Sequence, residues 1–335
     1  MTATANFPGL VQEIIDGFRL RRGDELSFLL DAPLDELQKS AGKLQQHFCG
    51  KHIDLCTIIN GRSGRCSEDC RYCAQSARHH TDCKEYGFLS ADELIANAKA
   101  NEAAGANRIA IVTSGRALQG DDFDKAIAAY ERMRDELSIG LCASHGIIGA
   151  EEFSRLRRAG VTSYHHNIET SRRYFPQICT THTYDDRIRT IKLAQSEGLN
   201  VCSGGIIGMG ETWEDRLDMA ISLAELGIQS IPINALMPIP GTPLEGMERI
   251  SPEDILRTIA IFRFLNPTAN IRLAAGRKLL PENGATAFLS GASASITGNM
   301  LTTSGTTMKE DIDMLARLGL TNKEDKSQAD NSGVC

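Results

Sequence analysis

The sequence has few aromatic residues, no block of basic residues and no long hydrophobic run. Aromatic side chains make up 5% of the 335 residues, and the formal net charge is −7. This composition argues against nucleic acid or an anionic membrane surface as the main partner. No apolar stretch approaches the roughly 20 residues needed to span a bilayer. Residues 1–10, MTATANFPGL, lack the basic start and apolar core of a secretory signal, so we expect a cytoplasmic protein without a membrane segment.

Disulfide bonds and phosphate-binding loops are not expected either. The chain has ten cysteines, but thiols stay reduced in the cytoplasm and should not form a disulfide framework there. The glycine-rich stretch GGIIGMGE (204–211) has neither Walker-A nor G-x-G-x-x-G spacing. Metal binding or catalysis is therefore the better interpretation of the clustered cysteines.

What the chain does have is a repeating unit of a short β-branched run, a polar or glycine-containing turn and an amphipathic helical stretch. This alternation favours a parallel sheet, and eight strands favour a closed (β/α)8 barrel of the TIM type over an open doubly wound sheet. The predicted strands are 52–59, 107–113, 138–144, 162–168, 200–206, 229–236, 270–275 and 293–297. The predicted helices are 90–104, 121–136, 150–159, 184–197, 213–226 and 251–265.

The two ends of the chain differ from this unit. We predict an N-terminal helical extension over residues 1–47, the barrel over 48–318, and a polar tail over 319–335 that is expected to be disordered. The hydrophobic content of 41% is enough for a large core. In a barrel of this type the active site lies at the carboxyl ends of the strands, in the loops that follow them.

The segment GRCSEDCRYCAQS places Cys66, Cys70 and Cys73 in the loop after the first predicted strand. A structural zinc site closes a tetrahedron with four protein ligands, and this C-x3-C-x2-C run supplies only three. A four-iron cluster held by three thiolates keeps one iron open for a substrate or cofactor. Two other interpretations stay open here: a zinc site completed by His79 or His80, and an accidental grouping of cysteines.

The same run, with Tyr72 before its last cysteine, resembles the radical S-adenosylmethionine superfamily. The resemblance implies a 4Fe-4S cluster on the three cysteines, with S-adenosylmethionine chelated to the open iron and cleaved reductively to a 5′-deoxyadenosyl radical. The chain between residues 50 and 305 also resembles the biotin synthase family. That likeness rests on five segments in order: GRCSEDCRYCAQS, HHNIETS, CSGGIIGMGET, PINALMPIPGTPL and IRLAAGRK.

The second resemblance implies conversion of dethiobiotin to biotin. Each of two strong C–H bonds would need a deoxyadenosyl radical, and an auxiliary iron–sulfur cluster would supply the sulfur that closes the ring. The implied partners are a flavodoxin- or ferredoxin-type electron donor and the iron–sulfur assembly machinery, and the implied assembly is a homodimer. Two other functions stay open: a related radical enzyme, such as the hydrogenase maturase or the methylornithine-forming mutase, and a non-enzymatic iron–sulfur carrier.

The auxiliary cluster is where the sequence departs from the family pattern. The resemblance implies that Arg272 is a ligand of this cluster, but Ala110 stands where the second strand should carry a ligand cysteine. We expect Cys142, Cys179 and Cys202 to form a replacement trio. We favour a four-iron cluster with an extra sulfide over a 2Fe-2S cluster that uses the arginine as well. The other interpretations are a structural salt bridge for Arg272 and simple apolar packing for Cys179.

The remaining expected site residues come from the same resemblance. Side chains alternate along YHHNIET, so His165, Asn167 and Glu169 share one face of the fourth strand. The histidine and the glutamate replace an asparagine and an aspartate of the family pattern. The expected contacts to S-adenosylmethionine are Tyr72, Asn167, Glu169, Arg187 and Ile206, and the expected substrate contacts are His165, Asn167 and Asn234. For Arg187 a solvated surface position is the alternative, and no role is expected for Cys49, Cys56, Cys83 and Cys335.

Overall fold

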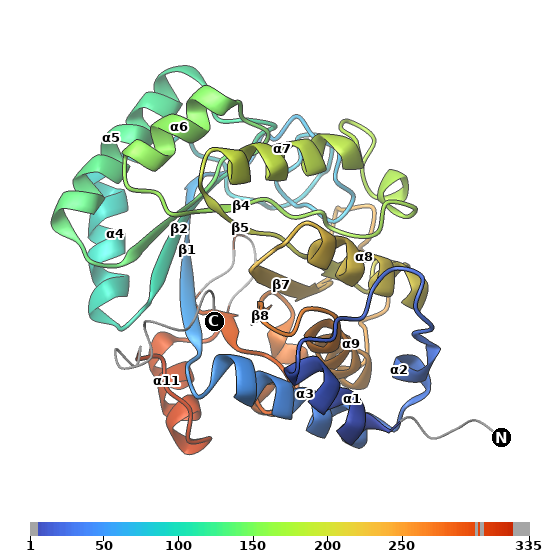
Figure 1. Ribbon diagram of the computed structural model, residues 1–335. Coiled ribbons are helices and arrows are strands. Elements are labelled where there is room, and N and C mark those ends of the chain that lie inside the picture. Colours follow the sequence, from blue (N-terminus) through green and yellow to red (C-terminus); the bar gives the residue numbers. More distant parts are fainter. Residues whose placement is uncertain (1–5, 299–300, 302–304, 324–335) are drawn as a thin grey trace.

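Parallel strands pair with one another all the way around a closed barrel (Figure 1). The computed structural model describes residues 6–298, 301 and 305–323, so Cys335 and most of the predicted tail lie outside the described residues. The strands are β1 (Asp54–Arg62), β2 (Arg108–Thr113), β3 (Gly140–Ser144), β4 (Ser163–His165), β5 (Asn200–Cys202), β6 (Gly205–Ile207), β7 (Ser230–Ala235), β8 (Asn270–Leu273) and β9 (Ala294–Ile296). β5 and β6 are two pieces of a single strand position, β5 pairs with β7, and β9 pairs with β1. The predicted eight-stranded barrel is confirmed.

The strands form where the sequence has β-branched and aliphatic runs. Both faces of a barrel strand are covered, one by the interior and the other by helices, so such strands are apolar almost continuously. In β2, four of the six residues are buried, and in β8 all four are buried. The ends of the predicted strands differ from the observed ends by up to three residues.

Helices follow the strands and form the outer layer of the barrel (Figure 1). The six predicted helices are confirmed, with ends that agree within one residue. Side-chain caps begin several of them: Ser90 accepts from the Glu93 N–H, and Ser251 accepts from the Asp254 N–H. The main helices are α4 (Ala91–Ala103), α5 (Gly120–Glu136), α6 (Ala150–Arg158), α7 (Tyr184–Ser196), α8 (Trp213–Glu225), α9 (Pro252–Leu265) and α11 (Met308–Arg317). Shorter helical turns are η1 (Phe175–Gln177), η2 (Arg277–Leu279), η3 (Pro281–Gly284) and α10 (Ala285–Phe288).

Three helices precede the barrel, in the region where an N-terminal extension is predicted. They are α1 (Phe7–Ile15), α2 (Ser27–Asp31) and α3 (Leu34–Cys49). α3 packs along α9 and against α1 (Figure 1). It also comes very close to the chain after α10, because a Cβ at Gly42 would lie 2.2 Å from the Leu289 carbonyl oxygen. Glycine is therefore needed at this contact.

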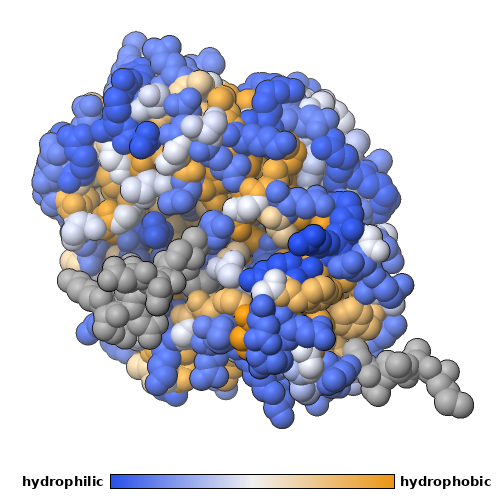
Figure 2. Space-filling view, in the orientation of Figure 1, coloured by the Kyte–Doolittle hydropathy of each residue, from blue (hydrophilic) through white to orange (hydrophobic). Residues whose placement is uncertain are grey.

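Figure 2, in the same orientation, shows mostly hydrophilic residues on the outward faces of the helices, with hydrophobic residues mainly between them. This distribution is that of amphipathic helices whose apolar sides pack inward. Within the described part of the chain, no helix is long and apolar enough to cross a membrane.

A buried ion pair fastens the last helix to the barrel. Arg277, after β8, donates from Nη2 to Asp311 Oδ1 of α11 at 2.6 Å and from Nη1 to Oδ2 at 2.9 Å. The side chains are 4% and 2% exposed. Thr297 and Thr306 also donate to the Asp311 carboxylate, at 2.7 and 3.0 Å, so its charge is fully compensated.

Asp311→Ala is expected to lower the free energy of unfolding by about 3–5 kcal/mol, because it leaves the Arg277 guanidinium buried without its partner. The matched control is Asp313→Ala on the same helix, which removes an exposed ion pair with Lys309 and should change stability little. Urea unfolding followed by circular dichroism measures both. Equal midpoints for the two variants would contradict the role assigned to Asp311.

Candidate active site

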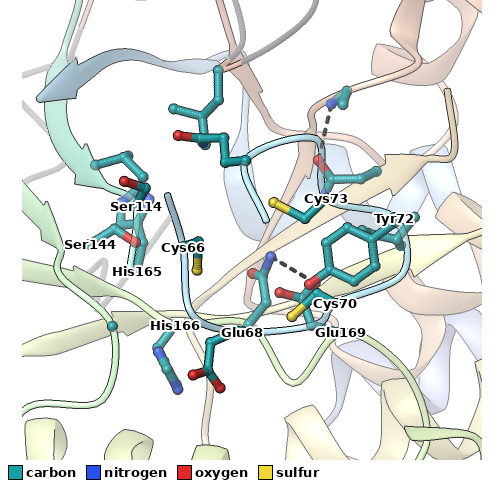
Figure 3. A pocket seen from close by; sticks show the side chains of 18 of the residues that line it. Cys66, Glu68, Cys70, Tyr72, Cys73, Ser114, Ser144, His165, His166 and Glu169 are labelled. Carbon is teal, nitrogen blue, oxygen red and sulfur yellow. Dashed lines mark hydrogen bonds between the residues drawn. The ribbon is translucent and has the colours of Figure 1, made fainter. Parts of the chain in front are cut away.

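A cavity of about 390 Å³ opens at the carboxyl ends of the strands. We call it the outer cavity. Its walls come from the loop after β1, the ends of β2, β3 and β4, and the segments after β7 and β8. Cys66, Cys70 and Cys73 all line it, and Figure 3 shows them on a loop that curves along one side of this space.

The loop after β1 folds back on itself and so presents its first and last cysteines together. The Cys66 N–H donates to the Gln75 carbonyl oxygen at 2.9 Å, and the Ala77 N–H donates to the Cys66 carbonyl oxygen at 2.8 Å. The Cys73 N–H closes a tight turn on the Cys70 carbonyl oxygen at 2.9 Å. Because backbone bonds fix this shape, three thiols are held in place without a helix or strand.

This donor set fits an iron–sulfur cluster with one open position. Three thiols come from one loop, and the cavity beside them leaves space for another ligand. Among the described residues, those that line the outer cavity include neither His79 nor His80. His79 directs its Nδ1 to the Cys73 carbonyl oxygen at 2.9 Å instead. The arrangement therefore favours an open cofactor site over a closed zinc tetrahedron.

The segment after η1 holds the cysteine loop from its other side. Asp69 accepts from the Thr180 and Thr181 N–H groups at 2.9 and 3.2 Å. Burial alone would raise the pKa of Asp69, but the hydrogen bonds from Thr180 and its neighbours outweigh it, and the pKa is lowered. Glu68 Oε2 lies 2.5 Å from His182 Nδ1. Two carboxylates of the loop thus attach it to this segment.

Cys179 lies in that same segment, at the cysteine loop and away from the strands that carry Cys142 and Cys202, with which a trio is expected. Its Sγ is 3.8 Å from Cys70 Sγ and 3.3 Å from His182 Nδ1, so it contacts the loop of the first cluster. The ligand atoms of Cys70, Cys179 and His182 lie within 4.8 Å of one another. The Cys70 thiol donates to Cys179, which raises the pKa of Cys70 and lowers the pKa of Cys179 to about 4. Cys179 lies beside Cys70 because its segment docks onto the cysteine loop, and this docking cannot be deduced from the sequence alone.

Glu169 and Arg187 form a buried ion pair in the wall of the outer cavity. Arg187 Nη1 is 3.4 Å from Glu169 Oε1, and both side chains are 10% exposed. Arg187 also donates to the Asn167 carbonyl oxygen at 2.9 Å and to His182 Nε2 at 3.1 Å. Burial disfavours its charge, but Glu169 outweighs burial and raises the pKa of Arg187. These contacts exclude the surface position considered for this arginine.

The backbone of Glu169 is held in a left-handed conformation, with φ at +69°, which is unfavourable for a residue with a Cβ. Its N–H donates to the Gly204 carbonyl oxygen at 3.0 Å, and its own carbonyl accepts from the Ile206 N–H at 2.8 Å. A Cβ at Gly204 would lie 2.0 Å from the Pro232 carbonyl oxygen, and one at Gly205 would lie 2.3 Å from the Glu169 carbonyl oxygen. The two glycines of CSGGI therefore permit the close approach that positions Glu169.

The other expected cofactor and substrate contacts also line the outer cavity: Tyr72, His165, Asn167, Ile206 and Asn234. The amide of Asn234 is already used, since it donates to the Gly205 carbonyl oxygen and accepts from the Ala275 N–H, each at 3.1 Å. It holds two neighbouring segments at the mouth of the barrel. Burial lowers the pKa of His165, so its ring is neutral near pH 7.

A second cavity of about 200 Å³ lies deeper, toward the amino ends of the strands. We call it the inner cavity. Cys142, Cys202 and Arg272 line it, as predicted for residues that point into the barrel. His165 lines both cavities and so lies between them. Cys56, for which no role is expected from the sequence, lines the inner cavity as well.

Arg272 is enclosed among polar partners at the inner cavity. Its Nη2 donates to Asp54 Oδ1 at 2.7 Å, its Nη1 to the Ser295 carbonyl oxygen at 3.0 Å, and its Nε to Ser230 Oγ at 3.3 Å. Asp54 also pairs with Arg108 at 2.9 Å. Burial would raise the pKa of Asp54, but the two arginines outweigh it and lower it. The salt bridge considered for Arg272 is present, yet one carboxylate shared by two guanidinium groups leaves a positive charge beside the thiols.

Comparison with family models divides most of the chain into two matches. Residues 62–223 match the model described as the Radical SAM superfamily. Residues 232–321 match the one described as the Biotin and Thiamin Synthesis associated domain. Together the two matches cover the cysteine loop and most of the residues that line the inner cavity, but not Cys56 of β1.

Curated relatives extend over nearly the whole chain. A protein named biotin synthase from Clostridium beijerinckii is 60% identical over 310 residues, which are 92% of this chain and 98% of that protein. Proteins of the same name from Alkaliphilus metalliredigens and Akkermansia muciniphila are 56% and 51% identical over 92% of this chain and 98% and 96% of their own.

Solved structures share the fold. A methylornithine synthase superposes with a TM-score of 0.81 at 19% identity, over 96% of this chain and 98% of its own. A maturase of the [FeFe]-hydrogenase has the same TM-score at 18% identity, over 99% of this chain and 79% of its own. At such low identity the likeness shows the fold alone.

Cys179→Ser is expected to keep the auxiliary cluster that the resemblance implies, because the Cys179 thiol lies at the outer cavity. The matched change Cys142→Ser removes a thiol of the inner cavity and should lower the auxiliary iron. Mössbauer spectra of the two anaerobically purified variants distinguish the iron of the two clusters. Selective loss of the auxiliary signal in Cys179→Ser would instead indicate that Cys179 is a ligand of the auxiliary cluster, together with Cys142 and Cys202.

Proposed function

The chain belongs to the biotin synthase family, and on this basis we propose that it converts dethiobiotin to biotin by radical sulfur insertion. Two C–H bonds of the substrate are replaced by two C–S bonds, and each hydrogen atom leaves in a molecule of 5′-deoxyadenosine. When bound, a 4Fe-4S cluster with S-adenosylmethionine supplies the deoxyadenosyl radicals, and an auxiliary iron–sulfur cluster supplies the sulfur.

The observation that carries this proposal is the stacking of two thiol-lined cavities in one barrel, with His165 in the wall of both. Radical chemistry at carbon followed by sulfur capture needs two sites that face the same substrate. An electron carrier would need neither the inner cavity nor a barrel around it. The closed barrel also keeps water away from reactive intermediates.

In the outer cavity, Cys66, Cys70 and Cys73 hold the first cluster. Glu169, held by its ion pair with Arg187 at a buried place, offers a carboxylate that can accept hydrogen bonds from the ribose hydroxyl groups of S-adenosylmethionine, and Arg187 contacts the same cofactor. Tyr72, Asn167 and Ile206 line the same cavity and complete the cofactor contacts. The chain's task is to bind and orient the cofactor so that its reactive carbon faces the barrel.

Dethiobiotin is held between the two cavities. Its ureido ring has both N–H donors and a carbonyl acceptor, and a neutral imidazole can donate from one nitrogen and accept at the other. His165, which burial keeps neutral, fits this ring. Asn167 and Asn234 are the further substrate contacts, and the amide of Asn234 is fixed by its two hydrogen bonds.

In the inner cavity, Cys142, Cys202 and Arg272 hold the auxiliary cluster. The two guanidinium groups near a single carboxylate leave a positive charge that an anionic cluster would compensate. We favour a four-iron cluster with an extra sulfide over a 2Fe-2S cluster, because three protein ligands leave one iron of four free to carry the sulfide. The proposal also includes a flavodoxin- or ferredoxin-type donor, the iron–sulfur assembly machinery and a homodimer.

The direct test is anaerobic turnover of the reconstituted protein with dethiobiotin, S-adenosylmethionine and a reductant. Biotin should form with two deoxyadenosine molecules for each biotin, because two hydrogen atoms are removed. Deoxyadenosine formed without biotin, in protein with both clusters loaded, would contradict the proposed function. That outcome would favour a related radical enzyme instead.

Cys70→Ala is expected to abolish cleavage of S-adenosylmethionine and leave the barrel folded, since it removes a ligand in a loop. Cys66→Ala and Cys73→Ala should behave in the same way. The matched control is Cys83→Ala, whose thiol lies 3.7 Å from Ser63 Oγ and which should retain cleavage. Deoxyadenosine is quantified by chromatography. Deoxyadenosine formation equal to that of the parent protein in any loop variant would contradict the assignment of the first cluster.

Arg272→Met keeps much of the side-chain volume but removes the positive charge. Asp54 still has Arg108 as a partner, so we expect the barrel to fold. The Mössbauer or electronic spectrum of the auxiliary cluster should change, and biotin formation should fall, while cleavage of S-adenosylmethionine persists. An auxiliary spectrum identical to that of the parent would mean that Arg272 has only the structural role of its salt bridge.

A further inference from the structure

The inner cavity is one thiol short of the family pattern, because Ala110 of β2 stands where a ligand cysteine is expected. We propose that Cys56 of β1 is the third thiolate ligand of the auxiliary cluster, beside Cys142 and Cys202. This inference rests on the proposed function, since it names a further ligand of the same site. Its support comes from the register of the barrel, the contacts between the thiols and the charges around them.

Inward-pointing side chains of such a barrel lie in layers of four, each taken from alternate strand positions. Because the strands are tilted, a layer shifts by two residues toward the carboxyl end between one strand and the second strand after it. Cys56 pairs with Arg108 of β2, and Arg108 pairs with Gly140 of β3. Two residues beyond Gly140 is Cys142. Cys56 and Cys142 therefore belong to one layer.

The same step continues around the barrel through the other two residues of the site. From Cys142 it arrives at Cys202, and from Cys202 it arrives at Arg272. The pairs that carry these two steps are Cys142 with Ser163, Ser163 with Asn200, Cys202 with Ser230, and Ser230 with Asn270.

The layer then closes on Cys56. Arg272 pairs with Ala294 of β9, and Ala294 pairs with Asp54 of β1; two residues beyond Asp54 is Cys56. Four steps of two residues add up to the offset of eight that a barrel of this type requires. Three cysteines and one arginine thus fill all four places of a single layer.

Contacts between these side chains agree with the layer. The Cys56 and Cys142 side chains pack in one buried group, and Cys142 and burial raise the pKa of Cys56. The charge of Arg272 acts on both Cys56 and Cys202. All three cysteines are at most 4% exposed, so a cluster bound to them would be shielded from solvent.

The lost ligand and the proposed one are neighbours. Cys56, Ala110 and Cys142 form one small buried group, separate from the main hydrophobic core. Ala110 pairs in register with Cys142 and with Ile58, which is two residues beyond Cys56. A thiol moved from β2 to β1 therefore stays beside the same partner, and the cluster site can be retained.

A buried cysteine usually packs as a small apolar residue, but the surroundings of Cys56 do not fit that role. It lines a cavity together with the guanidinium groups of Arg108 and Arg272 and with Ser230. Arg108 and Arg272 share the single carboxylate of Asp54, and a cluster bound to thiolates would compensate the positive charge that is left over.

The experiment uses the full chain with Cys66→Ala, Cys70→Ala and Cys73→Ala, so that any remaining iron belongs to the inner cavity. Iron and sulfide are counted after anaerobic reconstitution, and a chelator titration measures how firmly the iron is held. Adding Cys56→Ala should lower the chelator concentration that removes half of the iron by about tenfold or more, since even changes outside the ligand set cost about 10–100-fold in metal affinity. Cys83→Ala in the same background is the matched control and should change nothing.

A rescue separates a ligand role from a folding defect. Cys56→Ala combined with Ala110→Cys places the thiol at the family position on β2 and should restore iron binding, whereas a defect caused by the loss of Cys56 packing would persist. Circular dichroism checks that each variant is folded. Unchanged iron, sulfide and Mössbauer spectrum in Cys56→Ala would overturn this inference and leave the proposed function standing. A background variant that binds no iron at all would overturn both.

Discussion

The closed parallel register of the barrel is the constraint on which the rest of the structure depends. Eight strand positions can close only with a fixed offset between them, and that offset decides which inward side chains share a layer. Residues far apart in sequence, on β1, β3, β5 and β8, are brought to one level at the inner cavity. The loops at the carboxyl ends then surround the outer cavity, so the two sites lie along one axis.

The outer site depends on a second kind of constraint, the docking of two loops. Carboxylates in the cysteine loop accept hydrogen bonds from the segment after η1. The left-handed Glu169, held by two backbone hydrogen bonds, turns its carboxylate toward Arg187. Neither loop is a regular element: backbone hydrogen bonds shape the cysteine loop, and the contacts with the segment after η1 hold it in place. Precise placement of the cluster loop therefore follows from tertiary contacts.

The barrel interior also holds charged groups that are costly to bury. Asp54 is shared between Arg108 and Arg272, and the surplus positive charge faces cysteines. Buried charges persist when partners compensate them. A thiolate-bound cluster in the inner cavity would supply the missing negative charge. The two arginines would then stabilise the cluster as well as pack in the barrel.

The sequence by itself determined the barrel, because hydrophobic periodicity and helix caps are local signals: the six helix ends agreed within one residue. It also predicted the cysteine loop, since Cys66, Cys70 and Cys73 are close in sequence. The positions of Cys56 and Cys179 were decided only by tertiary structure. Strand alternation shows that Cys56 can point inward but not which cysteines share its layer, because that depends on register around the whole barrel. Cys179 was expected at the inner cavity from its place after the fourth strand, but the docking of its segment onto Asp69 puts it beside Cys70.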